Sequence, residues 1–88
     1  MTRDEAAELL YQHIMNSDFN APYGVLINDG ASKTGKKCKV ITFGRARTLD
    51  ATLSIYSPKF IHLRTSSGRS ELFRTVDAVK DELARLYR

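Results

Sequence analysis

The fold of this chain is decided by residues 49–64, LDATLSIYSPKFIHLR, where apolar and polar side chains alternate on both sides of a proline. The apolar side chains stand at every second position: Leu49, Ala51, Leu53 and Ile55 before the turn, Ile61 and Leu63 after it. A period of two is typical of strands that bury one face. A three-residue loop at 57–59 keeps both apolar sets on one face, whereas a two-residue loop would place Ile55 opposite His62. We therefore predict an antiparallel hairpin with a three-residue loop.

The polar face of this hairpin carries aromatic and basic side chains. The predicted register places three pairs side by side on it: Tyr56 with Phe60, Ser54 with His62, and Thr52 with Arg64. We expect this outer face to lie in water, because the apolar face is the one that a core requires.

Helices are expected at both ends of the chain. Thr2 followed by Glu5 is a capping box, and apolar residues recur after it at helical spacing: Ala7, Leu10, Tyr11 and Ile14. Thr75 is expected to cap a second helix, whose apolar residues recur in the same way: Val76, Val79, Leu83 and Leu86. Both helices are therefore predicted to bury one stripe.

Three further strands are expected between the helices, at 23–27, 37–43 and 70–74, with a polar loop at 29–36 and a turn at 66–68. The buried face of residues 37–43 stays open, because apolar side chains occupy both faces: Cys38 and Val40 on one, Ile41 and Phe43 on the other. The predicted fold is α+β, in the order α-β-β-β-β-β-α. A four- to five-stranded antiparallel sheet carries the N- and C-terminal helices on one face, in a single domain of residues 1–88.

This order of elements is similar to that of double-stranded-RNA-binding domains. Those domains carry a lysine cluster at the start of their second helix, where this chain has Thr75-Val76-Asp77-Ala78-Val79. The departure falls on the residues that would bind phosphate, so we do not assign the chain to that family.

Composition excludes several classes of protein. With 88 residues, 42% of them hydrophobic and 27% charged, the chain has an ordinary globular balance and little room for a deep cleft. Its single cysteine, Cys38, cannot form an internal disulfide, and one thiol with two histidines cannot build a structural zinc site. No apolar run is long enough to cross a membrane. We predict a cytoplasmic protein without metal, cofactor or membrane contact.

Positive charge is concentrated in the middle of the chain. The formal net charge is +4, but residues 23–74 carry ten Lys and Arg against three Asp and Glu, whereas residues 1–22 carry one against four. Such an asymmetry indicates a surface that recognises anions.

Residues 30–37, GASKTGKK, match a phosphate-binding P-loop up to its last position. A P-loop requires Ser or Thr there and a helix next, but this chain has Lys37 followed by a predicted strand. We interpret the segment as a hairpin loop. No histidine or cysteine stands at an evident spacing from the partners that nucleophilic catalysis requires, so we predict no enzymatic activity.

The residues we expect to bind a partner are the cations of the middle segment and the outer-face side chains: Lys33, Lys36, Lys37, Lys39, Arg45, Arg47, Tyr56, Phe60, His62, Arg64 and Arg69. Exposed aromatic and Arg side chains are typical of protein interfaces. Small proteins of this size that carry few motifs often come from phages or mobile elements, where they act as inhibitors. We therefore predict a protein-interaction or inhibitor module that acts on a nuclease or nucleoprotein. The alternative is direct binding of nucleic acid by the same surface. A homodimer formed through the outer sheet face is also plausible from the sequence.

Overall fold

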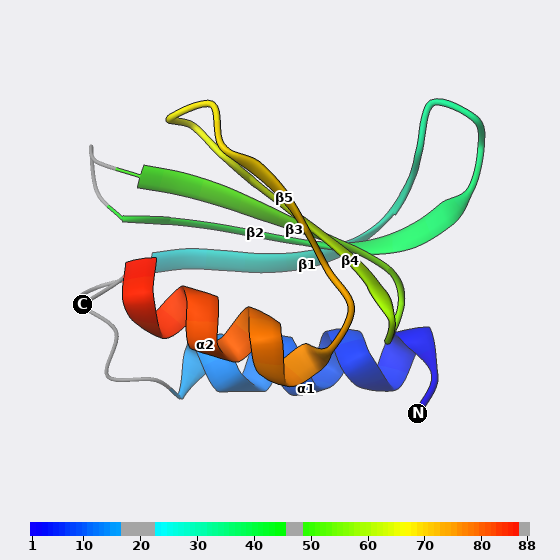
Figure 1. Cartoon of the computed structure of the whole chain (residues 1–88), viewed down its shortest axis with the longest axis horizontal. Coiled ribbons are helices and arrows are strands. Elements are labelled where there is room, and N and C mark those ends of the chain that lie inside the picture. The colour runs from blue at the N-terminus through cyan, green and yellow to red at the C-terminus, as the bar shows by residue number, and fades with distance from the viewer. Residues whose placement is uncertain (17–22, 46–48, 87–88) are drawn as a thin grey trace.

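The computed structural model describes residues 1–16, 23–45 and 49–86, which form one antiparallel sheet covered on one face by two helices (Figure 1). In chain order the elements are α1 (Arg3–Met15), β1 (Tyr23–Ala31), β2 (Lys37–Arg45), β3 (Leu49–Ser57), β4 (Phe60–Thr65), β5 (Ser70–Phe73) and α2 (Val76–Leu86). Each strand pairs with the next, in the order β1-β2-β3-β4-β5. The predicted fold class is therefore confirmed, with five strands among the described residues.

The core lies between the sheet and the helices. The apolar positions of β3 and β4 supply fully buried side chains, namely Leu53, Ile55, Ile61 and Leu63. The helices supply Leu10, Ile14, Val79 and Leu83, and all of these residues belong to one cluster. Burying one such side chain contributes about 1.5–3 kcal/mol relative to leaving it in water. The outer face of the sheet is thereby left without a second layer from the described residues.

The β3–β4 hairpin has the predicted register but not the predicted loop. Ile55 pairs with Ile61 as expected, yet β3 continues to Ser57 and β4 begins at Phe60, so the connection is only two residues long. A register shift between Ile55 and Ser57 leaves Tyr56 as a bulge. The three-residue loop is therefore wrong. The bulge absorbs the extra residue and keeps the apolar side chains of both strands on the core face.

The β1–β2 hairpin is longer than predicted, because β1 extends to Ala31 and leaves only residues 32–36 as a loop. Ile41 and Phe43 are buried in the core, which settles the open question of the face that β2 turns toward the helices. Cys38, which pairs with Gly30 near the end of the hairpin, is also buried, although it stands on the opposite face of β2 from Ile41 and Phe43.

Both helix starts are capped as predicted. The Thr2 hydroxyl accepts a hydrogen bond from the backbone N–H of Glu5 at 3.2 Å, and the Glu5 carboxylate accepts one from the Thr2 backbone N–H at 3.0 Å. These bonds lower the pKa of Glu5. The Thr75 hydroxyl accepts a hydrogen bond from the backbone N–H of Ala78 at 3.1 Å. Neither described helix has the length and apolar character that crossing a membrane requires.

Candidate nucleic-acid interface

The loop between β1 and β2 is a tight hairpin that projects away from the helices (Figure 1). Ser32 organises it: its backbone N–H donates to the carbonyl of Lys36 at 2.9 Å, and its hydroxyl accepts from the N–H of Lys36 at 3.1 Å. Gly35 has φ +85°, a conformation that favours glycine. A strand follows the loop rather than a helix, which confirms the interpretation of this segment as a hairpin loop.

The hairpin loop lies beside two aromatic rings at the β3–β4 turn. The Lys36 ammonium is 5.6 Å from the centroid of the Tyr56 ring and 5.0 Å from that of the Phe60 ring. These rings meet edge to face, with centroids 5.5 Å apart and planes at 85°. The prediction that the rings lie side by side is confirmed, although Phe60 pairs through the backbone with Ser57. A cation over exposed rings is a weakly attractive arrangement that leaves its positive charge available to a ligand.

A groove of about 560 Å³ runs between this hairpin and the outer face of β3 and β4. Its lining residues are Ala31, Ser32, Lys33, Thr52, Ser54, Tyr56, His62 and Arg64. The cross-strand pairs Thr52–Arg64 and Ser54–His62 are present as predicted. None of the described lining residues carries a carboxylate, so no acidic side chain of the groove competes with an anionic ligand for the hydroxyls and cations.

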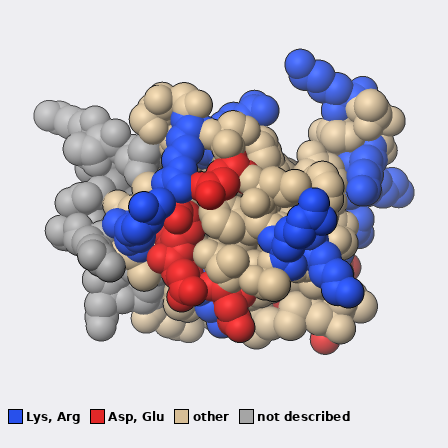
Figure 2. All heavy atoms as spheres, in the orientation of Figure 1, with Lys and Arg blue, Asp and Glu red and all other residues tan. Residues whose placement is uncertain are grey.

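Figure 2 shows Lys and Arg on the projecting hairpin, and further Lys and Arg on either side of a band of Asp and Glu on the helical side. An anionic ligand that approaches the groove beside the hairpin meets Lys33 and Arg64 and no carboxylate among the described lining residues.

His62 is oriented by a residue that the sequence did not indicate. His62 pairs across the strands with Ser54, as predicted. Its Nε2 atom, however, lies 2.6 Å from the hydroxyl oxygen of Ser70 on β5. Ser70 pairs with Arg64 across β4 and β5, which places its hydroxyl within reach of the ring. The interaction holds the imidazole in one orientation at the edge of the groove.

Several predicted binding residues lie elsewhere. Lys39 forms an ion pair with Asp29 at 2.6 Å, which raises the pKa of Lys39 and lowers that of Asp29. Arg69 forms ion pairs with Glu71 and, at 2.5 Å, with Glu82 of α2, so its side chain reaches the helical side of the sheet. These two cations have carboxylate partners and do not line the groove.

Lys37 is also not brought to the groove. Lys37 lies in a separate depression with Arg3 and Asp29. Arg45 ends β2, but its side chain, like the whole of Arg47, is outside the part of the chain that the structure describes.

Comparison with protein families, curated proteins and solved structures finds no match to this chain. Among the described residues, no group of three or more His, Cys, Asp or Glu side chains is arranged to hold a metal ion. The groove must therefore be interpreted from its own geometry.

Proposed function

We propose that this protein is a non-catalytic binding protein whose groove binds single-stranded nucleic acid. The observation that carries this proposal is the placement of Lys33 and Arg64 in the groove, and of Lys36 at its rim, with no carboxylate among the described lining residues. Three cations that face solvent together attract a phosphate backbone and release its counterions. The buried free thiol of Cys38 is consistent with the reducing, cytoplasmic setting that we also propose.

A single strand fits the aromatic side chains better than a duplex does. Phe60 is 39% exposed and its ring meets that of Tyr56 edge to face, so a base that displaces the Lys36 ammonium from the ring can stack on it. Stacking a base on an aromatic side chain contributes about 1–3 kcal/mol, and a duplex keeps its bases stacked on one another. The hydroxyls of Thr52 and Ser54 can hydrogen-bond phosphate or base edges without fixing a sequence.

The salt dependence of binding tests the role of the cations. For three phosphates neutralised in a single strand, the logarithm of the association constant should fall with the logarithm of salt concentration at a slope of about −2. Fluorescence anisotropy with labelled single-stranded DNA and RNA measures this slope. We expect Lys33→Gln or Arg64→Gln to make it shallower by about 0.7. The matched control is Arg85→Gln, which removes the same charge from an exposed position on α2.

The aromatic contribution is tested separately. Phe60→Ala should weaken binding of a single strand by about 5- to 150-fold, the equivalent of about 1–3 kcal/mol, while leaving the salt slope unchanged. Circular dichroism checks that the variant is folded. If Phe60→Ala and the groove variants bind as the unaltered protein does, or if duplex and single strand bind equally, the proposal fails.

A second candidate is a protein partner with an acidic surface, such as a nuclease or nucleoprotein, bound by the same outer face. It is favoured by Leu72, which is 40% exposed on β5 beside His62. Aromatic and Arg side chains are enriched at interface hot spots, and Leu72 adds exposed apolar surface beside them. Affinity capture from nuclease-treated lysate would supply the candidate partner. Leu72→Asn should then weaken binding of the purified partner without affecting oligonucleotide binding.

A further inference from the structure

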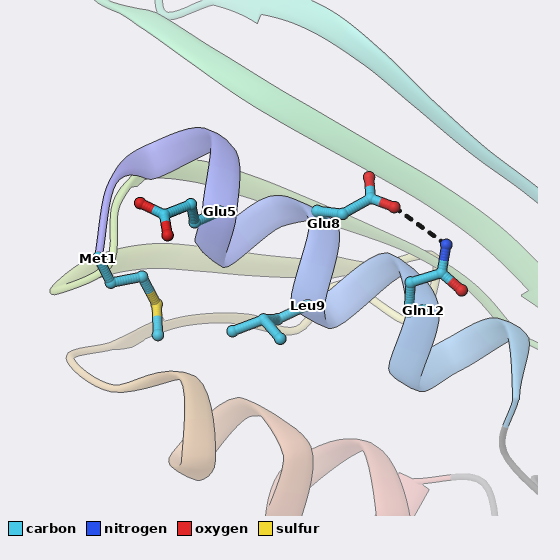
Figure 3. Close-up of a pocket in the computed structure, with 5 residues that line it drawn as sticks. All are labelled: Met1, Glu5, Glu8, Leu9 and Gln12. Atoms are coloured by element: carbon cyan, nitrogen blue, oxygen red, sulfur yellow. Dashed lines mark hydrogen bonds between the residues drawn. The ribbon is translucent and has the colours of Figure 1, made fainter.

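The helical side of the molecule carries a second groove, between α1, the start of α2 and the β3–β4 turn. In Figure 3 the side chains of Met1, which precedes α1, and of Leu9 on α1 lie on the side of α1 that faces α2. Met1 is 68% exposed and Leu9 45% exposed, so the centre of this surface is apolar and open to water. Neither side chain belongs to the core cluster.

Opposite charges flank this apolar centre. On one side, α1 presents the carboxylates of Glu5 and Glu8, which Figure 3 shows farther from α2 than Met1 and Leu9 are. On the other side stand the cations Lys59, Arg74 and Lys80. Within the described part of the chain these three cations form no ion pair at 4.0 Å or less, although Asp77 lines the same groove.

We propose that this surface is a two-fold interface with a second copy of the chain. A two-fold axis brings each patch against an identical one, so a surface complementary to itself must carry opposite charges on either side of its centre. Here such an axis near Leu9 places Met1 and Leu9 against their counterparts. It also sets the acidic side of each α1 over the basic side of the other copy. The contact removes exposed apolar side chains from water and gives the unpaired cations carboxylate partners.

The outer sheet face cannot form such a pair as readily. A two-fold contact there would place Lys33, Lys36 and Arg64 of both copies in one interface with no described groove carboxylate to separate them. Like charges brought together in an interface disfavour the contact. With the helical sides joined, the two outer faces point away from each other, and both nucleic-acid grooves stay open. The dimer would therefore hold two binding sites, although the interface itself does not depend on the proposed function.

Analytical ultracentrifugation over a range of protein concentrations tests the interface by charge reversal. We expect a reversible dimer of twice the 9.9 kDa chain mass, weakened by added salt. Glu8→Lys and Lys80→Glu should each weaken association by about tenfold or more, because each reversal places like charges together twice across the axis. The double variant Glu8→Lys/Lys80→Glu restores opposite charges and should recover most of the affinity.

Two further variants keep the test independent of folding. Leu9→Asn changes an exposed side chain and should weaken the dimer with unchanged circular dichroism. Lys33→Glu alters the outer face and should leave dimerisation intact. The proposal is overturned if the unaltered chain stays monomeric up to about 1 mM, where even weak specific contacts associate. It is also overturned if the double variant associates no better than the single ones, or if Lys33→Glu is the change that dissociates the dimer.

Discussion

Gly30→Ala is predicted to destabilise the protein through one identifiable contact. A Cβ atom added at Gly30 would lie 2.6 Å from Cγ2 of Val40 and 3.5 Å from Sγ of Cys38. Carbon atoms in good contact are about 3.5–4.0 Å apart, so the first of these contacts is short by about 1 Å. Val40 is β-branched and has few alternative rotamers, so the hairpin strands must shift to relieve the clash.

The magnitude follows from two opposing effects. Overpacking of this kind costs about 1–3 kcal/mol, and replacing a strand glycine by alanine returns about 0.5–1 kcal/mol of backbone entropy. The two effects offset to a net cost of about 0–2.5 kcal/mol, and because the contact is short by about 1 Å we expect Gly30→Ala to lower the free energy of unfolding by about 1–2 kcal/mol. For a domain of this size, that loss corresponds to a decrease in Tm of about 4–16 °C.

A double-mutant cycle with Val40→Ala isolates the contact. Removing Cγ2 of Val40 makes room for the new Cβ, so Gly30→Ala should cost about 1–3 kcal/mol less in the Val40→Ala background than in the unaltered chain, which is the whole overpacking cost. Urea unfolding followed by circular dichroism measures all four proteins. Additive effects of the two substitutions, or a Gly30→Ala variant as stable as the unaltered protein, would refute this reasoning.

Further predictions concern the core and the pH dependence of stability. Leu53→Ala removes a fully buried side chain and should cost about 2–5 kcal/mol in urea unfolding. Burial and Lys80 lower the pKa of His13, so the unfolded state binds the proton more readily. Stability should decline as pH falls below about 6.5, and His13→Gln should flatten that decline in thermal melts. Arg85 and Arg69 lower the pKa of Glu82. The ionised Glu82 carboxylate therefore contributes to the free energy of unfolding above about pH 4.3, and this contribution is lost in stronger acid. Glu82→Gln should reduce stability at pH 7 and weaken the acid dependence of urea unfolding.

Part of the candidate site could be predicted from local patterns. The period of two along residues 49–64 placed Tyr56, His62 and Arg64 on the outer face, because side chains of a strand alternate between its faces. The glycine-containing polar loop likewise identified the projecting hairpin that carries Lys33. These inferences needed only neighbouring residues.

Other features depend on partners that are distant in the sequence. In the sequence, nothing distinguishes Arg69 from the other cations of the middle segment. Its ion pair with Glu82 exists only because α2 packs on the sheet. Ser70 was not recognised because the β4–β5 pairing, rather than any motif, directs its hydroxyl toward His62. The bulge at Tyr56 was missed because the sequence alternates in the same way with or without it.

The sequence by itself determined the order of elements, the inward face of the central hairpin and the helix caps, since each depends on spacing within a few residues. Only the tertiary structure decided which cations remain available to a ligand. Lys33, Lys36 and Arg64 gather around an open groove, whereas Lys39 and Arg69 meet carboxylates. The physical reason is that a charge is neutralised by whichever group the fold places within a few ångströms, and sequence distance does not measure that separation.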